Sequence, residues 1–282
     1  MDGPDILARY LSKPNVSDKF GNVWQYHSRS DRHSIVGCWG VAFDLLATSA
    51  LLRNHANAGK VVLGVNHKMM DHLTQREKKL DLVIARPSSH LSQVGESLRS
   101  LVSRYGLPLN AAQSNLLLSL PDIPVGEVGA VLIALEAKAA MTAHTKARPR
   151  LHDELNSSQL AVHGSSSQAL AIALIQVNAA TQFVSNDLNK FSLKSNPAVV
   201  SSHKQPTDYL GVLEKVNMLP RRSGTSGVGF DGLGAVVLDF DNRGGPVSVV
   251  TAPPAPQPRQ PLHYESMIIR MANEYDSRFN AI

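Results

Sequence analysis

Glu136 and Lys138 are the residues of this sequence whose types and spacing best suit chemistry. They stand two positions apart at the end of the apolar run Ala130–Leu135. Alternate side chains of a β-strand share a face, so the carboxylate and the ammonium group would point the same way, with Ala137 opposite. Burying either charge unpaired is costly. The spacing alone therefore leaves two interpretations open, an ion pair that reaches solvent at a strand end and a functional site.

A second acid, Asp81, lies inside another apolar run, residues 80–84. Hard divalent cations bind oxygen ligands, so a site for one needs a second carboxylate from a neighbouring strand in addition to Glu136. A cation such as Lys138 would benefit the attacking water or a scissile phosphate. Asp81, Glu136 and Lys138 together indicate metal-dependent hydrolysis.

The elements that must position these residues are helices alternating with strands. In chain order we expect a helix at 40–56, strands at 60–65, 80–85 and 129–140, a helix at 149–163 with Pro149 in its first turn, and a strand at 169–177. Strands with such continuous apolar runs require cover on both faces. The expected fold class is therefore α/β, with a central β-sheet flanked by helices.

This order of elements, with an acid on the second strand and Glu136-Ala137-Lys138 on the third, resembles the core of the PD-(D/E)XK nucleases. Type II restriction endonucleases belong to that superfamily. The resemblance covers about residues 40–180 and is carried by a short motif. It implies a restriction-endonuclease-like core built on a mixed sheet. It also implies that Asp81 and Glu136 bind Mg²⁺, with Mn²⁺ as a substitute, and that Lys138 lowers the pKa of the attacking water or steadies the pentavalent phosphate.

The first acid of the motif has two candidates. The stretch between Asp81 and Glu136 is longer than the usual gap in the family, whereas Asp122 is much nearer and follows Pro121 directly. Asp122 also precedes Pro124 closely, and prolines at that density suit a loop better than a central strand. We therefore favour Asp81, which requires a helical insertion near residues 90–125.

Basic residues follow the motif and are candidates for contact with a phosphate backbone. They are His144, Lys146, Arg148 and Arg150. A solvated loop and helix start explains them equally well, and the sequence leaves both interpretations open.

Three segments are expected along the chain. Residues 1–36 are polar and mixed and predict an irregular start, and the nuclease-like core follows at 37–185. Residues 186–282 are rich in Gly, Ser, Asn and Pro and predict a C-terminal extension. Its expected elements are a β-hairpin from 233–240 and 247–250, a Pro-rich connector at 253–261 and a terminal helix at 262–279.

Composition restricts the class of protein. With 43% apolar and 18% charged residues, the 282-residue chain has enough apolar side chains for a packed core, and disorder throughout is excluded. A net charge of +5 permits a polyanionic partner without requiring one. Cys38 is the single cysteine, which excludes an internal disulfide and favours a reducing compartment. With no signal peptide or long apolar run in the sequence, we expect a cytoplasmic protein that does not span a membrane.

The function expected from these observations is a Mg²⁺-dependent endonuclease acting on DNA, in restriction or another bacterial defence system. A homodimer is one arrangement that the sequence leaves open. Two alternatives also remain open at this stage: a catalytically silent nucleic-acid-binding or assembly module on the same fold, and a nuclease acting on RNA. No aromatic stacking platform is evident in the sequence, so it does not separate DNA from RNA.

Overall fold

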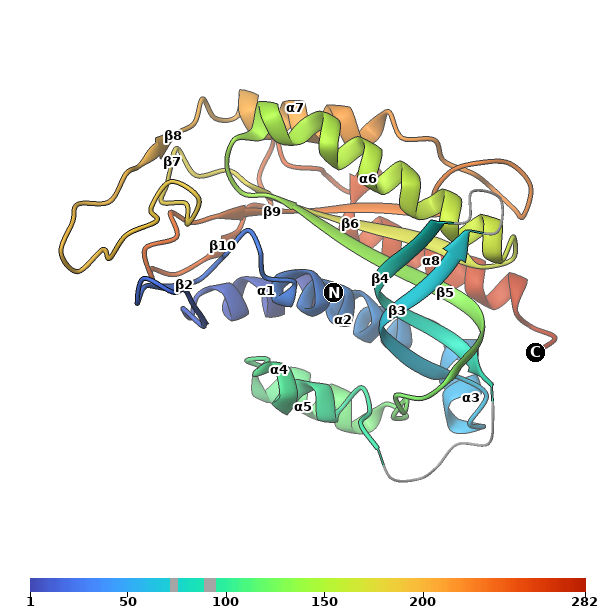
Figure 1. Cartoon of the computed structure of the whole chain (residues 1–282). Coiled ribbons are helices and arrows are strands. Elements are labelled where there is room, and N and C mark those ends of the chain that lie inside the picture. The colour runs from blue at the N-terminus through green and yellow to red at the C-terminus, as the bar shows by residue number, and fades with distance from the viewer. Residues whose placement is uncertain (72–75, 89–94) are drawn as a thin grey trace.

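The structure is a computed structural model that describes residues 1–71, 76–88 and 95–282. Its centre is a seven-stranded sheet with the strand order β10-β9-β6-β5-β4-β3, in which β11 also pairs with β9 (Figure 1). The strands are β3 (Val62–Asp71), β4 (Arg76–Pro87), β5 (Val128–Ala140), β6 (Leu170–Asn178), β9 (Gly232–Asp239), β10 (Ser248–Val249) and β11 (Leu262–His263).

The sheet is mixed. Strands β3, β4 and β5 pair antiparallel, whereas β5, β6 and β9 pair parallel. A parallel pair needs a crossover, and α6 (His144–Ser165) supplies it between β5 and β6. The expected α/β class with a central mixed sheet flanked by helices is confirmed. Strand β5 lies in the interior of the sheet between β4 and β6, as the apolar run before Glu136 predicts.

Helices cover both faces of this sheet. One face packs against α1 (Gly3–Leu11), α2 (Arg32–Thr48) and α8 (Tyr264–Arg278), and the other packs against α6 and α7 (Thr207–Asn217). The remaining helices are α3 (Ala50–Asn57), α4 (Ser100–Tyr105) and α5 (Ala111–Ser119). Two separate apolar clusters result, one on each face, so every central strand is buried on both sides.

Two expectations about helices are wrong. Residues 1–36 are not irregular throughout, because α1 buries an apolar face that includes Ile6, Tyr10 and Leu11. Helix α6 begins at His144, so Pro149 lies inside it rather than in its first turn. Proline suits a first turn because it lacks an N–H, but packing of α6 on the sheet outweighs the one backbone hydrogen bond that an interior proline removes.

The helical insertion expected near residues 90–125 is present where the structure describes it. Helices α4 and α5 are separated at Gly106, whose φ of 65° ends α4 in the left-handed region that glycine favours. Residues 89–94 of this stretch lie outside the described residues.

The C-terminal segment completes the central sheet rather than forming a separate layer. Its expected hairpin is β9–β10, and β9 pairs with β6 from Ile172↔Gly232 to Asn178↔Leu238. The expected terminal helix is α8, which packs on the same face as α2.

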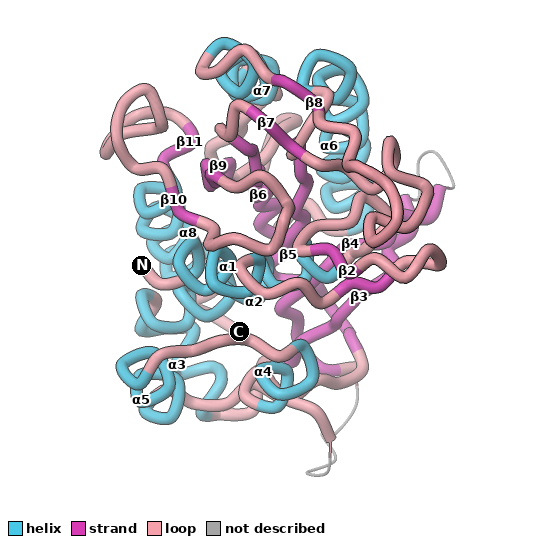
Figure 2. The backbone as a smooth tube through the Cα atoms, turned by 90° about the vertical axis from the view of Figure 1, so that its left-hand side faces the viewer, coloured by secondary structure: helices cyan, strands magenta, loops and turns pink. Residues whose placement is uncertain are grey.

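Two loop segments form a side lobe, which we define as residues 13–31 and 182–203. They carry the short strand pairs β1 (Val16–Ser17) with β2 (Val23–Trp24), and β7 (Gln182–Phe183) with β8 (Ser201–Ser202). Asn22 Nδ2 donates to Phe191 O at 2.8 Å, and Ser28 N donates to Asn186 Oδ1 at 3.0 Å. These bonds hold the two segments together on the side of the molecule that faces the viewer in Figure 2.

Across the three described stretches of chain, no single helix is long and apolar enough to cross a membrane. Helices α2 and α3 meet the criteria of length and composition only as a pair, across a bend of 97°.

Asp44 ties α1, α2 and α8 together. Its buried carboxylate accepts hydrogen bonds from Asp2 N, Gly3 N and the Tyr264 hydroxyl, each at 2.9 Å. Burial raises the pKa of Asp44, and these donors work against that rise. One side chain therefore caps α1 and anchors α8.

We expect Asp44→Ala to lower the free energy of unfolding by about 2–4 kcal/mol, because it leaves buried donors without an acceptor. Urea denaturation at neutral pH measures the change. Glu214→Ala, which removes an exposed acid of α7, is the matched control and should cost less than about 0.5 kcal/mol. Equal stabilities of the two variants would contradict this account of Asp44.

Candidate active site

The candidate site lies where β4 separates from β5. The paired residues of these strands run from Pro87↔Val128 to Leu82↔Leu135. Strand β4 continues with β3 as far as Asp71↔Arg76, and β5 continues with β6 as far as Ala140↔Val177. The β3–β4 hairpin therefore diverges from the rest of the sheet, as Figure 1 shows, and opens a fork in its interior.

Asp81 is the first residue of β4 beyond the last pair. Its Oδ2 accepts a hydrogen bond from the backbone N–H of Ala137 at 2.8 Å. The carboxylate thus satisfies a backbone donor of β5 that the departing strand no longer reaches. Because Ala137 stands between Glu136 and Lys138, this bond brings the three sequence-predicted residues to one point.

Glu136 and Lys138 form a close ion pair in this fork. Lys138 Nζ lies 2.6 Å from Glu136 Oε1, and the two side chains are 26% and 4% exposed, respectively. Lys138 Nζ also lies 3.8 Å from Glu154 Oε2 on α6. The other carboxylate oxygen of Glu136, Oε2, is buried and has no hydrogen-bond partner among the residues that the structure describes. A buried acceptor left without a donor or cation is unusual in a folded protein.

Burial and the neighbouring charges shift the pKa values of these groups. Burial, reinforced by the negative charge of Glu136, raises the pKa of Asp81 to about 7, although the Ala137 N–H and Lys138 oppose the rise. Burial alone would lower the pKa of Lys138, but Glu136, Asp81 and Glu154 outweigh it and raise that pKa overall. Lys138 is therefore charged at neutral pH, and Asp81 is close to its titration midpoint.

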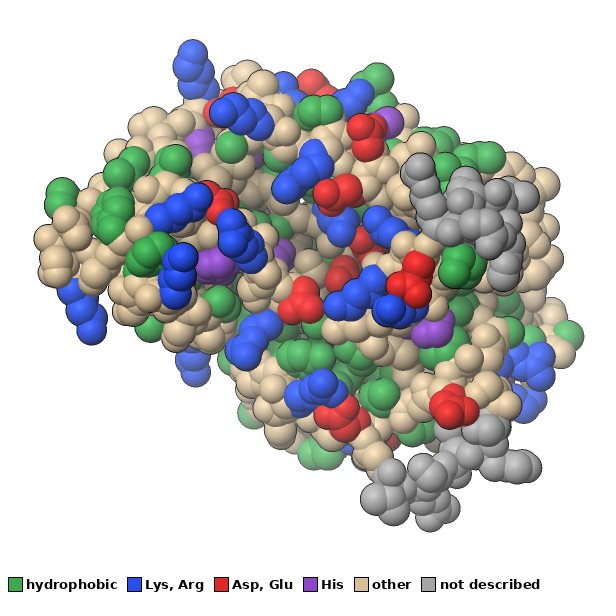
Figure 3. Space-filling model, in the orientation of Figure 1, with side chains coloured by type: hydrophobic (Ala, Val, Ile, Leu, Met, Phe, Trp, Pro, Cys, Tyr) green, Lys and Arg blue, Asp and Glu red, His purple; other side chains and the backbone are tan. Residues whose placement is uncertain are grey.

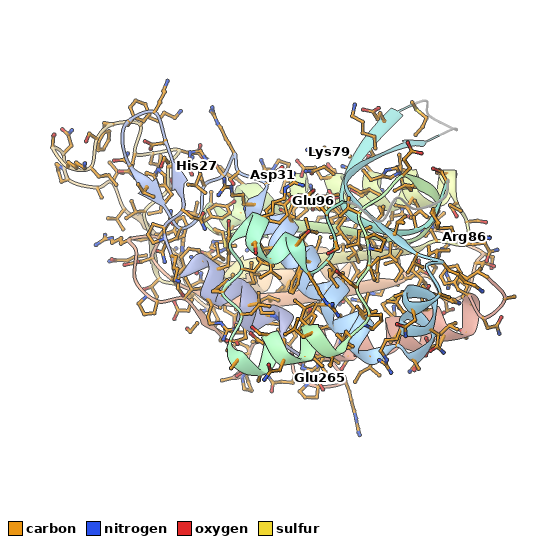
Figure 4. All side chains as sticks on the ribbon, turned by 90° about the horizontal axis from the view of Figure 1, so that it is seen from below. His27, Asp31, Lys79, Arg86, Glu96 and Glu265 are labelled. Atoms are coloured by element: carbon orange, nitrogen blue, oxygen red, sulfur yellow. The ribbon has the colours of Figure 1, made fainter. Side chains whose placement is uncertain are left out.

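Helix α2 forms the wall of the site near its N-terminus. The Sγ of Cys38 lies 4.0 Å from Asp81 Oδ2, and burial together with Asp81 raises the pKa of this thiol. Burial and the positive charge of Lys138 lower the pKa of His33 to about 4, so its ring is neutral. Asp31 Oδ2, just before α2, lies 3.9 Å from Lys79 Nζ on β4, and Figure 4 shows both at one edge of the molecule. Because burial and Asp81 keep its thiol protonated, Cys38 is a buried neutral neighbour of the site and not a nucleophile.

Sequence reasoning missed two polar residues of the site. Asn66 of β3 stands opposite Asp81, between the pairs Val65↔Leu82 and His67↔Leu80, and its φ is 55°. In the described stretches of the chain, its buried Oδ1 has no hydrogen-bond partner. An Asn inside an apolar strand is a weak signal for such a position, because Asn tolerates the left-handed region better than most residues. The other is Glu154 of α6, whose contact with Lys138 no motif in the sequence signals.

Asp122, the alternative first acid, lies elsewhere. Its Oδ1 accepts a hydrogen bond from Arg99 N at 3.1 Å, at the beginning of α4. Asp81 is therefore the acid that the fold brings to the Glu136-Ala137-Lys138 segment.

The four basic residues after the motif do not form one surface. His144 is 2% exposed, and its Nε2 lies 2.9 Å from Asn178 O, so the expectation that it faces a phosphate backbone is wrong. Arg148 is half-buried and donates to Asp208 O of α7 at 3.3 Å. Lys146 and Arg150 are exposed. Residues four apart in a helix share a face, so His144 and Arg148 face the protein interior, whereas Lys146 and Arg150 lie on the exposed side of α6.

A pocket of about 440 Å³ adjoins the fork. It begins at Ala139, the residue after Lys138, and passes Lys146 and Arg150 of α6 to Tyr26 and Asn186 of the side lobe. In Figure 3, acidic and basic side chains surround a hollow between the side lobe at left and the hairpin region at right.

The carboxylates of Asp81 and Glu136 suit Mg²⁺, which keeps several water ligands, better than a cation that needs a complete shell of protein ligands. Among residues 1–71, 76–88 and 95–282, no group of three or more His, Cys, Asp or Glu side chains is arranged to hold a metal. Mg²⁺ commonly binds through one or two carboxylates and completes its shell with water and substrate phosphates. The unpartnered Oε2 of Glu136 and the raised pKa of Asp81 are both features that a cation between these acids would relieve.

Comparison with known proteins adds no assignment. No family model matches the chain, and neither a curated protein nor a solved structure matches it significantly. Function is therefore inferred from the site alone.

The raised pKa of Asp81 predicts how stability depends on pH in the metal-free protein. Because the folded state holds a proton on Asp81 up to about pH 7, its contribution to stability falls as pH rises from about 4 through about 7. Asp81→Asn keeps a neutral acceptor for the Ala137 N–H. Relative to wild type, this variant should gain about 2–3 kcal/mol between pH 5 and pH 8.

Urea denaturation in EDTA at pH 5, 6.5 and 8 measures this difference. Asp122→Asn is the matched control and should follow the wild-type pH profile. Parallel profiles for Asp81→Asn and wild type would show that Asp81 ionises normally.

Proposed function

We propose that this chain is a metal-dependent endonuclease that hydrolyses phosphodiester bonds of DNA on a PD-(D/E)XK-like core. The observation that supports it most is the hydrogen bond from Ala137 N to Asp81, which brings one carboxylate to the Glu136–Lys138 pair at a fork in the sheet. Two acids and a lysine at an opening between strands suit charge stabilisation of a phosphoryl group.

Each of the three residues has a role in this proposal. Asp81 and Glu136 would hold Mg²⁺, or Mn²⁺ in its place. When bound, such a cation supplies Lewis-acid polarisation of a phosphoryl oxygen and a more acidic water. Lys138, with a raised pKa, is protonated and therefore acts as a cation beside the phosphate rather than as a base. Because the His33 ring is neutral, it adds no second positive charge near Lys138.

The proposed partner is DNA. Lys146 and Arg150 extend along the pocket beside Lys138, where backbone phosphates on either side of the scissile one would pass. A homodimer, which would present one site to each strand of a duplex, belongs to the same proposal. The proposal also includes a cytoplasmic location, which the single free and buried Cys38 supports. It includes a role in restriction or another bacterial defence as well.

A second candidate is a catalytically silent binding or assembly module on the same fold. One observation favours it, since Lys138 Nζ lies 2.6 Å from Glu136 Oε1 and already neutralises that carboxylate directly. The unpartnered Glu136 Oε2 and the convergence of Asp81 on the same point favour the nuclease. A nuclease acting on RNA would use the same three residues.

Mg²⁺ binding can be tested without any substrate. We expect millimolar Mg²⁺ to raise the melting temperature at pH 8 by about 2–4 °C, because a ligand present at about ten times its dissociation constant stabilises the folded state by roughly 1.4 kcal/mol. Glu136→Gln should lose this shift, whereas Asp122→Asn should keep it. Differential scanning fluorimetry against EDTA gives the measurement, and an equal shift in Glu136→Gln would place the cation elsewhere.

Cleavage tests the catalytic assignment. Wild type should cut DNA with Mg²⁺ or Mn²⁺ and not with EDTA. Glu136→Gln and Lys138→Met should each lower the rate at least about 100-fold, because each removes charge stabilisation at the phosphate. The double variant Glu136→Gln/Lys138→Met removes both partners of the ion pair, so neither partner is left as an unpaired buried charge.

Plasmid, linear duplex, single-stranded DNA and RNA are compared side by side, and circular dichroism checks the fold of each variant. Asp122→Asn should cut like wild type. The silent-module candidate forecasts an inactive wild type whose nucleic-acid binding both substitutions leave unchanged. Cleavage by the double variant at the wild-type rate would refute the assignment of Glu136 and Lys138.

A further inference from the structure

A second pocket continues the one beside Lys138. It has a volume of about 320 Å³ and is formed by the two segments of the side lobe. The two pockets share Arg29, Asn186 and Asp187. We call these two adjoining pockets together the lobe trough. It runs from Ala139, next to the catalytic candidates, to Lys190 at the far end of the side lobe.

The lobe trough has an excess of positive charge. Its cations are Lys19, Arg29, Lys146, Arg150 and Lys190, against the two carboxylates of Asp18 and Asp187. Asp18 is committed to the lobe itself, since its Oδ2 accepts from Trp24 Nε1 at 2.8 Å and its Oδ1 from Phe20 N at 2.8 Å.

The cations, by contrast, are largely free to bind a ligand. Within the described part of the chain, the side chains of Arg29, Lys146 and Lys190 take part in no ion pair or hydrogen bond. All three are exposed. A row of unpaired cations beside a phosphodiesterase-like site suits a chain of phosphates.

The dimensions of the lobe trough suit one strand rather than two. Each of its pockets has a volume typical of a site for a small ligand. A rigid duplex does not enter such a depression, whereas a flexible single strand does. Two aromatic rings, Phe20 and Tyr26, line its walls, and Lys19 Nζ lies 5.2 Å from the centre of the Phe20 ring. Single-strand-binding grooves combine cations for the backbone with aromatic faces for the bases.

The side lobe is held in shape by internal hydrogen bonds. Asn22 accepts from Leu193 N at 2.9 Å, and Asn189 Nδ2 donates to Ser185 O at 2.8 Å and to Val199 O at 2.9 Å. The Asn22 bond joins the two segments of the lobe, and the Asn189 bonds hold the loop from Ser185 to Val199 in shape, so the trough is pre-organised for a ligand. Figure 2 shows the two loop segments of the lobe side by side, and His27 of the trough lies on the same edge as Asp31 in Figure 4.

We propose that the lobe trough binds single-stranded nucleic acid and leads the strand to Asp81, Glu136 and Lys138. The preferred substrate is then a single strand, or a duplex with a single-stranded tail, rather than a blunt duplex. The identity of the substrate rests on the proposed nuclease function, but binding in the trough does not.

Binding is measured by fluorescence anisotropy with a labelled oligo-dT in EDTA, where no cleavage occurs. Arg29→Ala/Lys190→Ala should weaken binding about 10-fold or more. It should also lower the slope of log K against log salt by about 1.4, since each phosphate contact on a single strand contributes about 0.7. Lys60→Ala/Lys215→Ala removes the same charge from outside the trough and should leave both values unchanged.

Competition decides between one strand and two. Unlabelled oligo-dT should displace the probe, and a blunt duplex of equal length should do so at least about 10-fold less well. If the duplex competes equally, or if Arg29→Ala/Lys190→Ala binds like the control variant, the trough is not a single-strand site. Wild type that binds the probe in the trough but cuts no nucleic acid with Mg²⁺ or Mn²⁺ would refute the nuclease proposal and leave the trough intact.

Discussion

The site depends on one hydrogen bond, from the backbone N–H of Ala137 to the carboxylate of Asp81. Without it, the separation of β4 from β5 after Leu82↔Leu135 would leave a buried backbone donor in the middle of the sheet without a partner. The side chain replaces the ladder bond that the diverging strand cannot make. The same contact therefore makes the fork tolerable and brings an acid to the two charged residues of β5.

The consequence is an electrostatic conflict that is only partly resolved within the protein. Two carboxylates lie close together at the base of the fork, and Lys138 neutralises just one of them directly. The conflict is visible in the raised pKa of Asp81 and in the unpartnered oxygen of Glu136. Structural ion pairs can be satisfied completely, whereas sites that act on another molecule often retain such a deficit.

The surroundings of the fork are arranged around that deficit. Helix α2 seals one side with the neutral groups Cys38 and His33. Helix α6 contributes Glu154 to Lys138 and continues outward through exposed Lys146 and Arg150. The side lobe, whose Phe183 packs into the apolar cluster on the α2 face of the sheet, extends this path. A charged centre beside an exposed, basic pocket is the arrangement on which both proposals rest.

By itself, the sequence determined the alternation of helices and strands, the interior position of β5 and the shared face of Glu136 and Lys138. Those follow from local apolar patterns, because continuous runs need two-sided burial and alternate residues of a strand share a face. It also favoured Asp81 over Asp122, because prolines on both sides of Asp122 indicate a loop.

The tertiary structure alone decided how distant segments meet. Asn66 stands opposite Asp81 because β3 pairs with β4, and His144 is buried because the start of α6 packs against β6. The lobe trough joins residues 18–29 to 186–190 and α6, and no local pattern signals it. Contacts between residues far apart in sequence are set by which surfaces bury one another, and periodicity within a segment carries no information about its partner.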